Sequence, residues 1–227
     1  MGRGDPAQAF DRIVRLTGRP GPMDPKRISI FPLAGAILYP GMQLPLRIFE
    51  PRYRAMVTDA LARDSRIGMI QPQRPQESAP LFAIGCLGKI AEFEALADGR
   101  FNILLEGEAR FRVLRELDVT TPFRQVEGEL FHELEHEALA AVERAGFERE
   151  AQRFASAQGY SVDWEGVSRL DDASLINGVA QVAPFDPAAK QALLEAPDLS
   201  TRCELMVQLM QFFSRRDDSD GDQATLQ

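Results

Sequence analysis

The sequence predicts an α+β fold, with strands in the first half of the chain and helices in the second half. Apolar and polar residues alternate between Asn102 and Val113, which is typical of a half-buried antiparallel strand. Before residue 50, Pro32, Pro40 and Pro45 exclude a continuous helix, because proline lacks an amide donor and fits short or edge strands. After residue 131 the apolar spacing becomes helical, at Phe147, Ala151, Phe154 and Ala155.

The first half reads as short strands around one helix. Tyr39-Pro40-Gly41-Met42 is typical of a tight turn, because proline presets φ and glycine accepts positive φ. Glu50-Pro51 places an acidic residue and an N1 proline at a helix start. Further strands are predicted at residues 66–71, 81–95 and 123–131, and Asp98-Gly99 supplies a hairpin turn before the alternating strand.

The second half predicts a series of short helices. Asp172 is expected to cap the second of them, and Asp186-Pro187 to begin the third. Thr201 and Glu204 fit a capping box at the start of the last helix. In the second helix the residues expected to face inward are Leu175, Ile176, Val179, Val182 and Ala183.

Composition and charge argue against several classes of protein. The 227 residues carry a formal net charge of −8, and no region is strongly basic, so the electrostatic footprint of a nucleic-acid-binding protein is missing. We find no apolar run long enough for a membrane span and no secretory signal, so we expect a cytoplasmic protein without a membrane partner. Cys86 and Cys203 are expected to be buried free thiols.

Several short motifs make this chain resemble the N-terminal substrate-binding domain of the Lon protease family. The motifs that carry the resemblance are Phe31-Pro32-Leu33, Leu38-Tyr39-Pro40-Gly41, Leu44-Pro45-Leu46 and Ile48-Phe49-Glu50-Pro51-Arg52-Tyr53. Weaker matches follow at Glu106-Gly107, at Arg110-Phe111-Arg112 and between Lys190 and Arg202.

The resemblance implies a PUA-like β-barrel with an inserted helix, followed by a small helical domain. We therefore expect a flexible N-terminal arm over residues 1–24 and the barrel over 25–135. The helical domain would cover 136–216, and a disordered acidic tail 217–227. The resemblance also implies a substrate-recognition module without catalysis, here as a stand-alone member that lacks ATPase and protease domains.

The motifs needed for those two activities are missing from the sequence. The only Gly-Lys pair is Gly88-Lys89, which is followed by Ile90, so the hydroxyl residue of a phosphate-binding loop is lacking. None of the lysines lies in a segment that resembles the Lon serine–lysine dyad. We therefore expect a protein that is not an enzyme and needs no cofactor.

One pattern competes with this interpretation. His132-Glu133-Leu134-Glu135-His136 satisfies the HExxH pattern of zinc peptidases, with Glu150 as a third ligand. The pattern must lie within a helix, whereas here it follows a predicted strand. We expect no metal and interpret the segment as a polar junction between strand and helix.

The expected partners are exposed apolar segments of unfolded or damaged proteins, with a separate protease left open as a second partner. The candidate contact residues are Tyr39, Pro40, Met42, Phe49, Arg52 and Tyr53, because turn-borne tyrosine and methionine suit adaptable contacts. For Phe49 and Tyr53, a place in the core between barrel and helix is equally compatible with the sequence.

RNA binding is the remaining alternative, since PUA-like barrels also bind RNA. Arg110 and Arg112 would make the anion contacts if this were so. The competing interpretation, which we favour, places both arginines on the solvated face of the alternating strand, paired with acidic neighbours across the sheet. The net charge is also against RNA as a partner.

Overall fold

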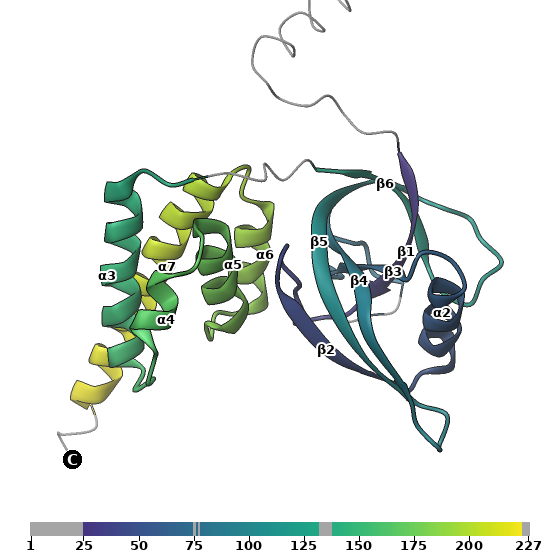
Figure 1. The fold of residues 1–227 in the computed structure, drawn as a ribbon, viewed down its shortest axis with the longest axis horizontal. Coiled ribbons are helices and arrows are strands. Elements are labelled where there is room, and N and C mark those ends of the chain that lie inside the picture. The colour runs from purple at the N-terminus through teal and green to yellow at the C-terminus, as the bar shows by residue number, and fades with distance from the viewer. Residues whose placement is uncertain (1–24, 75, 77, 132–137, 224–227) are drawn as a thin grey trace, which may run out of the picture.

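The computed structural model describes residues 25–223 apart from 75, 77 and 132–137. A six-stranded sheet forms one end of the molecule, and the helices that follow residue 140 form the other, as Figure 1 shows. This confirms the predicted α+β class. The expected arm over residues 1–24 lies outside the described residues. Within the described part of the chain, no helix is long and apolar enough to cross a membrane.

The strands form a nearly continuous ring of pairings. They are ordered β2-β5-β4-β3-β1-β6, and β6 also pairs with β5, so only β2 lies outside the ring. The pair β1–β3 is parallel and the other pairs are antiparallel. The strand bounds are β1 Lys26–Pro32, β2 Gln43–Ile48, β3 Arg66–Ile70, β4 Ile84–Ala95, β5 Phe101–Glu116 and β6 Gln125–Leu130.

β5 is the strand that connects the sheet. Residues 101–106 pair with β2, whereas the segment from Phe111 to Glu116 pairs with β6. Along its other edge β5 pairs with β4 from Phe101 to Arg112. Its 16 residues allow one strand to serve three neighbours.

A β-bulge in β5 reverses the alternation that the sequence shows. Gly107 pairs with Gly88 and Ala109 with Leu87, so Glu108 is an extra residue. An inserted residue moves every later side chain to the opposite face of the strand. Phe111 consequently packs in a small cluster inside the ring, with Ile30 and Val126 among its neighbours. The face continuous with Leu105 instead carries Arg110, which the sequence placed on the solvated face and which is only 4% exposed.

Gly107 marks the point where the turn before β2 crosses β5. Its amide donates to the carbonyl oxygen of Met42 over 2.9 Å, and its carbonyl oxygen accepts from Gly41 over 2.8 Å. A Cβ atom at this position would lie 2.1 Å from the carbonyl oxygen of Tyr39. The predicted turn is confirmed, with Gly41 at φ 76°, and only glycine at position 107 leaves room for it.

The helix inserted after β2 is α2, Pro51–Leu61, and its start is as predicted. Glu50 is the N-cap residue and Pro51 occupies the first turn. The buried face consists of Tyr53, Met56, Val57 and Ala60, and it contacts β1 and β3.

The second half contains five helices within the described residues. They are α3 Ala141–Ala157, α4 Trp164–Ser168, α5 Asp172–Val182, α6 Pro187–Glu195 and α7 Leu199–Gln223. The buried stripe of α3 is the predicted one, Phe147, Ala151, Phe154 and Ala155. α7 includes residues 217–223 of the segment expected to be a disordered tail, and residues 224–227 lie outside the described part.

Two predicted helix caps are displaced. The cap of α5 is Asp171, whose carboxylate accepts from the Ser174 amide over 2.9 Å. At the start of α7, Asp198 accepts from the Thr201 amide over 2.8 Å, so Thr201 lies inside the helix. Both carboxylates are three residues before the amide they bind, which is the normal capping distance. Asp186 caps α6 as predicted, by accepting from the Ala189 amide.

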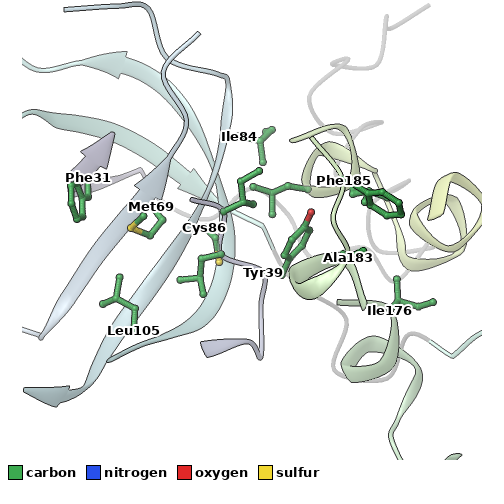
Figure 2. Packing of buried hydrophobic residues seen from close by; sticks show 14 of the residues in the cluster. Phe31, Tyr39, Met69, Ile84, Cys86, Leu105, Ile176, Ala183 and Phe185 are labelled. Carbon is green, nitrogen blue, oxygen red and sulfur yellow. The ribbon is translucent and has the colours of Figure 1, made fainter. Parts of the chain in front are cut away.

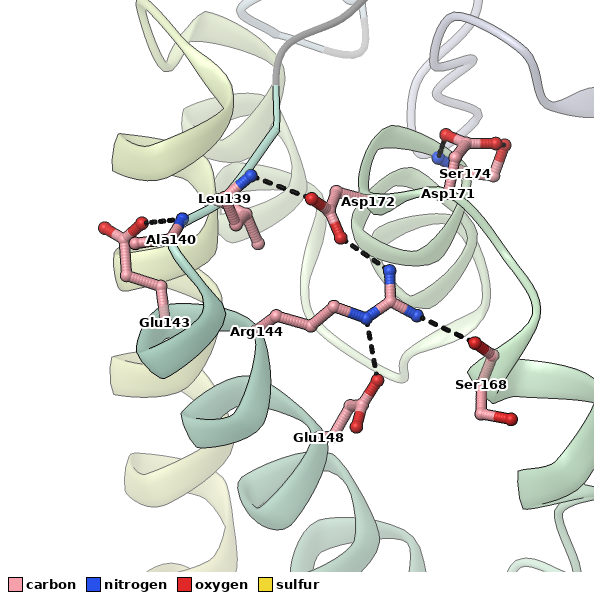
Figure 3. A network of polar contacts seen from close by, with 9 residues as sticks. All are labelled: Leu139, Ala140, Glu143, Arg144, Glu148, Ser168, Asp171, Asp172 and Ser174. Carbon is pink, nitrogen blue, oxygen red and sulfur yellow. Dashed lines mark hydrogen bonds and ion pairs between the residues drawn. The ribbon is translucent and has the colours of Figure 1, made fainter.

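Asp172 does not cap α5 as predicted, but joins α3 to α5. Its carboxylate accepts from the Leu139 amide over 2.8 Å and pairs with Arg144. Arg144 also pairs with Glu148 over 2.9 Å and donates to the carbonyl oxygen of Ser168 (Figure 3). This network therefore fixes the start of α3 against α4 and α5.

The two cysteines are free and buried, Cys86 in β4 and Cys203 in α7, as the sequence predicts. Burial raises the pKa of the Cys203 thiol to about 11, and nearby carboxylates add to this rise. The thiol is therefore protonated at neutral pH.

Sheet and helices meet at α6, and polar side chains join them. Arg110 donates to the carbonyl oxygens of Leu194 (3.1 Å), Ala196 and Pro197 (3.4 Å), which lie at the end of α6. On the same helix, Gln191 donates to the carbonyl oxygen of Ile84 over 3.0 Å. The prediction that Arg110 pairs with acidic neighbours on a solvated face is therefore wrong.

We expect Arg110→Met to lower the free energy of unfolding by about 3 kcal/mol or more. The change removes the Arg110 donor from the carbonyl oxygens of the buried residues Leu194 and Ala196, and each such group costs about 1–3 kcal/mol. Arg112→Met is the matched control, because Arg112 is exposed on the same strand and such a change stays within about 0.5 kcal/mol. Urea denaturation followed by circular dichroism measures both. Equal stability of the two variants would contradict the role assigned to Arg110.

Candidate functional site

The six predicted contact residues flank β2 instead of forming one surface. Tyr39, Pro40 and Met42 come before this strand, and Phe49, Arg52 and Tyr53 come after it. Two of the six, Tyr39 and Tyr53, are buried. The six residues therefore form two separate groups, one before β2 and one after it.

The group before β2 lies at the junction between sheet and helices. Tyr39 is fully buried, and Figure 2 shows it between the strands and the segment that carries Phe185. Its hydroxyl donates to the carbonyl oxygen of Lys190 over 2.7 Å, and burial raises its pKa. The carbonyl oxygen of Pro40 accepts from Asn177 over 3.0 Å. A surface role for Tyr39 is therefore wrong, because the residue holds the turn against α5 and α6.

The group after β2 has one exposed aromatic residue. Tyr53 packs against Phe31 with 4.2 Å between ring centroids, which confirms its place in the core. The guanidinium of Arg52 lies 4.5 Å from the Tyr53 ring and also pairs with Glu50 over 2.8 Å. Phe49 is 63% exposed. It is the member of this group that remains available to a partner.

The zinc alternative has no support in the described part of the chain. His132 and His136 lie outside the described residues, and Glu150 lies on α3. Among the residues that are described, no three His, Cys, Asp or Glu side chains gather as a metal site would require.

A cavity of about 650 Å³ with several charged residues in its lining opens beside β1 and the start of β3. Its lining includes Lys26, Arg27, Arg63 and Arg66, which would suggest an anion site. Arg66 is, however, paired with Glu108 over 2.5 Å, and Arg63 is paired with Asp59. Two of the four cations therefore already have anionic partners, and the lining also contains Asp64 and Glu108, so the cavity is weak support for RNA binding.

An apolar groove of about 250 Å³ lies between α3, α4 and α5. Among the described residues, no charged side chain lines it, and the hydroxyl residues of the lining are Tyr160 and Ser174. Several of the lining side chains are also open to solvent, notably Val182 at 78%, Tyr160 at 52% and Leu170 at 43%. A soluble surface seldom leaves adjacent apolar residues open without a partner, so this groove is the best candidate site.

This groove is not predicted from the sequence. Val182 was expected to face inward on α5, but it is the most exposed residue of the lining. The available signal was the run of apolar residues between two helices, at Tyr160, Val162, Trp164, Val167 and Leu170. These residues do not follow a single period, because they belong to a loop and a five-residue helix.

Comparison with known proteins identifies the domain. A family model described as the ATP-dependent protease La (LON) substrate-binding domain matches residues 27–211. Lon protease 2 of Myxococcus xanthus is 25% identical over 195 residues, which cover 82% of this chain and 24% of that protein. Lon protease of Escherichia coli K12 is 26% identical over 211 residues, or 83% of this chain and 26% of that protein. The chain thus spans about a quarter of the length of the curated relatives it matches.

Two solved structures share the fold. A crystal structure of a Lon N-terminal domain protein from Xanthomonas campestris aligns with a TM-score of 0.63 at 22% identity, over 81% of this chain and 98% of that chain. The N-terminal domain of Mycobacterium avium complex Lon protease aligns with a TM-score of 0.63 at 21% identity, over 82% of this chain and 98% of that chain. At this level of identity the likeness concerns the fold alone.

The position of Tyr39 generates a stability prediction. We expect Tyr39→Phe to lower the free energy of unfolding by about 1 kcal/mol at neutral pH, because the carbonyl oxygen of Lys190 loses its donor. The effect should depend on pH. Since folding raises the pKa of Tyr39 above the ordinary 10.0, its stabilising contribution is complete below pH 10 and is lost as pH rises beyond it.

Denaturation of both proteins between pH 7 and pH 11 measures this effect. The stability difference between wild type and Tyr39→Phe should shrink above pH 10, since phenylalanine does not titrate. A difference that stays constant or grows at high pH would show that burial of the hydroxyl has no linked titration.

Proposed function

Because this chain belongs to the ATP-dependent protease La (LON) substrate-binding domain family, we propose that it is a non-catalytic polypeptide-binding module. Its ligands are exposed apolar segments of unfolded or damaged proteins. In the cytoplasm it acts as an adaptor that presents such segments to an ATP-dependent protease. The observation that carries the proposal is the open, uncharged groove between α3, α4 and α5.

The distribution of lysine supports a role without catalysis. The chain has three lysines, and a Lon-type serine nucleophile needs one of them beside it. The Lys190 amine donates to the carbonyl oxygen of Gln181 over 2.8 Å, so it is engaged in a contact between α6 and α5. Lys89 is exposed on β4, in the single Gly-Lys pair, which lacks the hydroxyl residue of a phosphate-binding loop.

The size of the groove sets the expected affinity. Burial of one large apolar side chain contributes roughly 1.5–3 kcal/mol, and a groove of about 250 Å³ holds only a few of them. Association and the ordering of a flexible segment oppose this gain. We therefore expect dissociation constants on the order of micromolar, which suit a module that samples many clients.

Recognition through side chains fits this chain better than strand addition. β2 is the strand outside the ring, so its free edge is the place where an extended segment would pair. Pro45 lies in the middle of that strand and cannot donate an amide, which weakens such pairing. Beside this edge, Phe49 offers an exposed ring, and we propose it as an auxiliary contact.

Reduced, unfolded casein tests the proposal. The full chain should bind casein with a dissociation constant on the order of micromolar that changes little between low and high salt, because apolar burial is not screened. The casein should remain uncleaved with and without ATP. Absence of binding, or binding that disappears with added salt, would overturn the proposal.

The same titration tests the auxiliary contact. Phe49→Asp should weaken casein binding about threefold to tenfold, since the exposed ring that casein would cover is replaced by a carboxylate. Phe212→Asp is the matched control, because Phe212 is 55% exposed on α7 and lies outside the groove. Equal effects of the two substitutions would remove Phe49 from the contact surface.

A further inference from the structure

The groove between α3, α4 and α5 combines an apolar floor with an acidic border. Phe154 and Leu175 supply the floor, and Trp164, Tyr160 and Val182 stand at its open side. Aromatic side chains give large contact areas at low entropic cost, so this lining is well suited to holding apolar side chains. In the described part of the chain the lining carries no charged residue, so it favours apolar side chains.

The border of the groove carries the charge. Residues 158–186, which provide most of the lining, contain five acidic residues and a single basic one, Arg169. Arg169 pairs with Glu165, and Asp172 pairs with Arg144 of α3. The negative charge that no ion pair of the described residues compensates is therefore that of Asp163, Asp171 and Asp186. Asp163 precedes the lining residue Trp164, and Asp171 follows the lining residue Leu170.

Two of these acidic groups are held in place by the starts of α4 and α5. Asp163 accepts from the Gly166 amide over 3.1 Å, and Asp171 caps α5. Hydrogen bonds from Ser174 hold the pKa of Asp171 below its ordinary value. The negative border is thus fixed by the helix starts that also shape the groove.

We propose that this groove is the site where client polypeptides bind, and that it selects apolar segments flanked by lysine or arginine. The inference rests on the proposed function and adds to it a location and a ligand chemistry. Apolar side chains of the client fill the lining, while its cationic flanks lie over the acidic border. Like charges placed over that border would repel, so segments with acidic flanks are rejected.

Trp164 makes the site directly observable, because it is the only tryptophan in the sequence and lines the groove. The probes are two synthetic peptides without tryptophan that share one core of five aliphatic residues. One carries two lysines at each end and the other two glutamates. Peptide binding to the full chain is followed by the emission of Trp164.

We expect the lysine-flanked peptide to shift the Trp164 emission and to bind at least about tenfold tighter than the glutamate-flanked peptide at low salt. The difference should narrow at high salt, since the border is exposed and screened. Equal affinities of the two peptides would overturn the charge selection. Casein binding that Val182→Asn leaves unchanged would overturn the location and leave the proposed function standing.

A pair of valines gives a matched control. Val182→Asn should weaken binding of the lysine-flanked peptide about tenfold, because Val182 lines the groove. Val142→Asn should have no effect, because Val142 on α3 is 76% exposed, close to the 78% of Val182, and lies outside the lining. Both residues are exposed, so neither change threatens the fold. Equal binding by the two variants would overturn the groove as the site.

The chain itself contains one competing ligand. Phe10, Ile13, Val14 and Leu16 are interspersed with Arg12 and Arg15, which is the ligand chemistry proposed here. If clients are the occupant, Ile13→Asp in the full chain should leave the affinity for the lysine-flanked peptide unchanged. Tighter peptide binding by that variant would identify the N-terminal segment as the occupant and overturn the assignment to clients.

Discussion

The buried guanidinium of Arg110 is the interaction on which the arrangement of sheet and helices depends. Removing a charge from water is costly, so a buried cation needs partners that direct oxygen atoms at it. The end of α6 provides them, because the last carbonyl groups of a helix have no partners within the helix and carry partial negative charge. The charge and the helix end therefore satisfy each other, and neither is stable at this depth alone.

Other polar side chains at the same junction make this packing specific. Arg202 donates to the carbonyl oxygen of Leu193 and to Asn177, whose amide in turn donates to Pro40. Gln71 reaches the carbonyl oxygen of Pro187 over 3.0 Å. Apolar contacts alone would allow the helices to slide on the sheet, whereas directional hydrogen bonds permit one position. Since Asn177 lies on α5, one wall of the apolar groove is held by the sheet.

What the sequence predicts here is set by local rules. The turn at Tyr39–Met42, the start of α2 and the buried stripe of α3 depend on neighbouring residues, and all three are as predicted. Arg110 was misplaced because one extra residue, Glu108, changes the face of every later side chain, and no local pattern reveals where a bulge lies. Tyr39 was expected at the surface and is buried, whereas Val182 was expected to face inward and is exposed, for a related reason. Whether an apolar residue is buried depends on which distant element covers it, and the groove itself exists only where a loop and three helices meet.

The ring of strand pairings also constrains how the chain can be made. Lys26 of β1 pairs with Gly128 of β6, so one edge of the first strand has no partner until roughly a hundred further residues have been synthesised. At about 5–20 residues per second that interval is roughly 5–20 s, during which β1 presents an open edge inside the cell. Pro32 at the end of β1 and the cationic pair Lys26 and Arg27 at its start make that edge a poor template for pairing with other chains. These residues thus protect the incomplete domain from aggregation while it is still being synthesised on the ribosome.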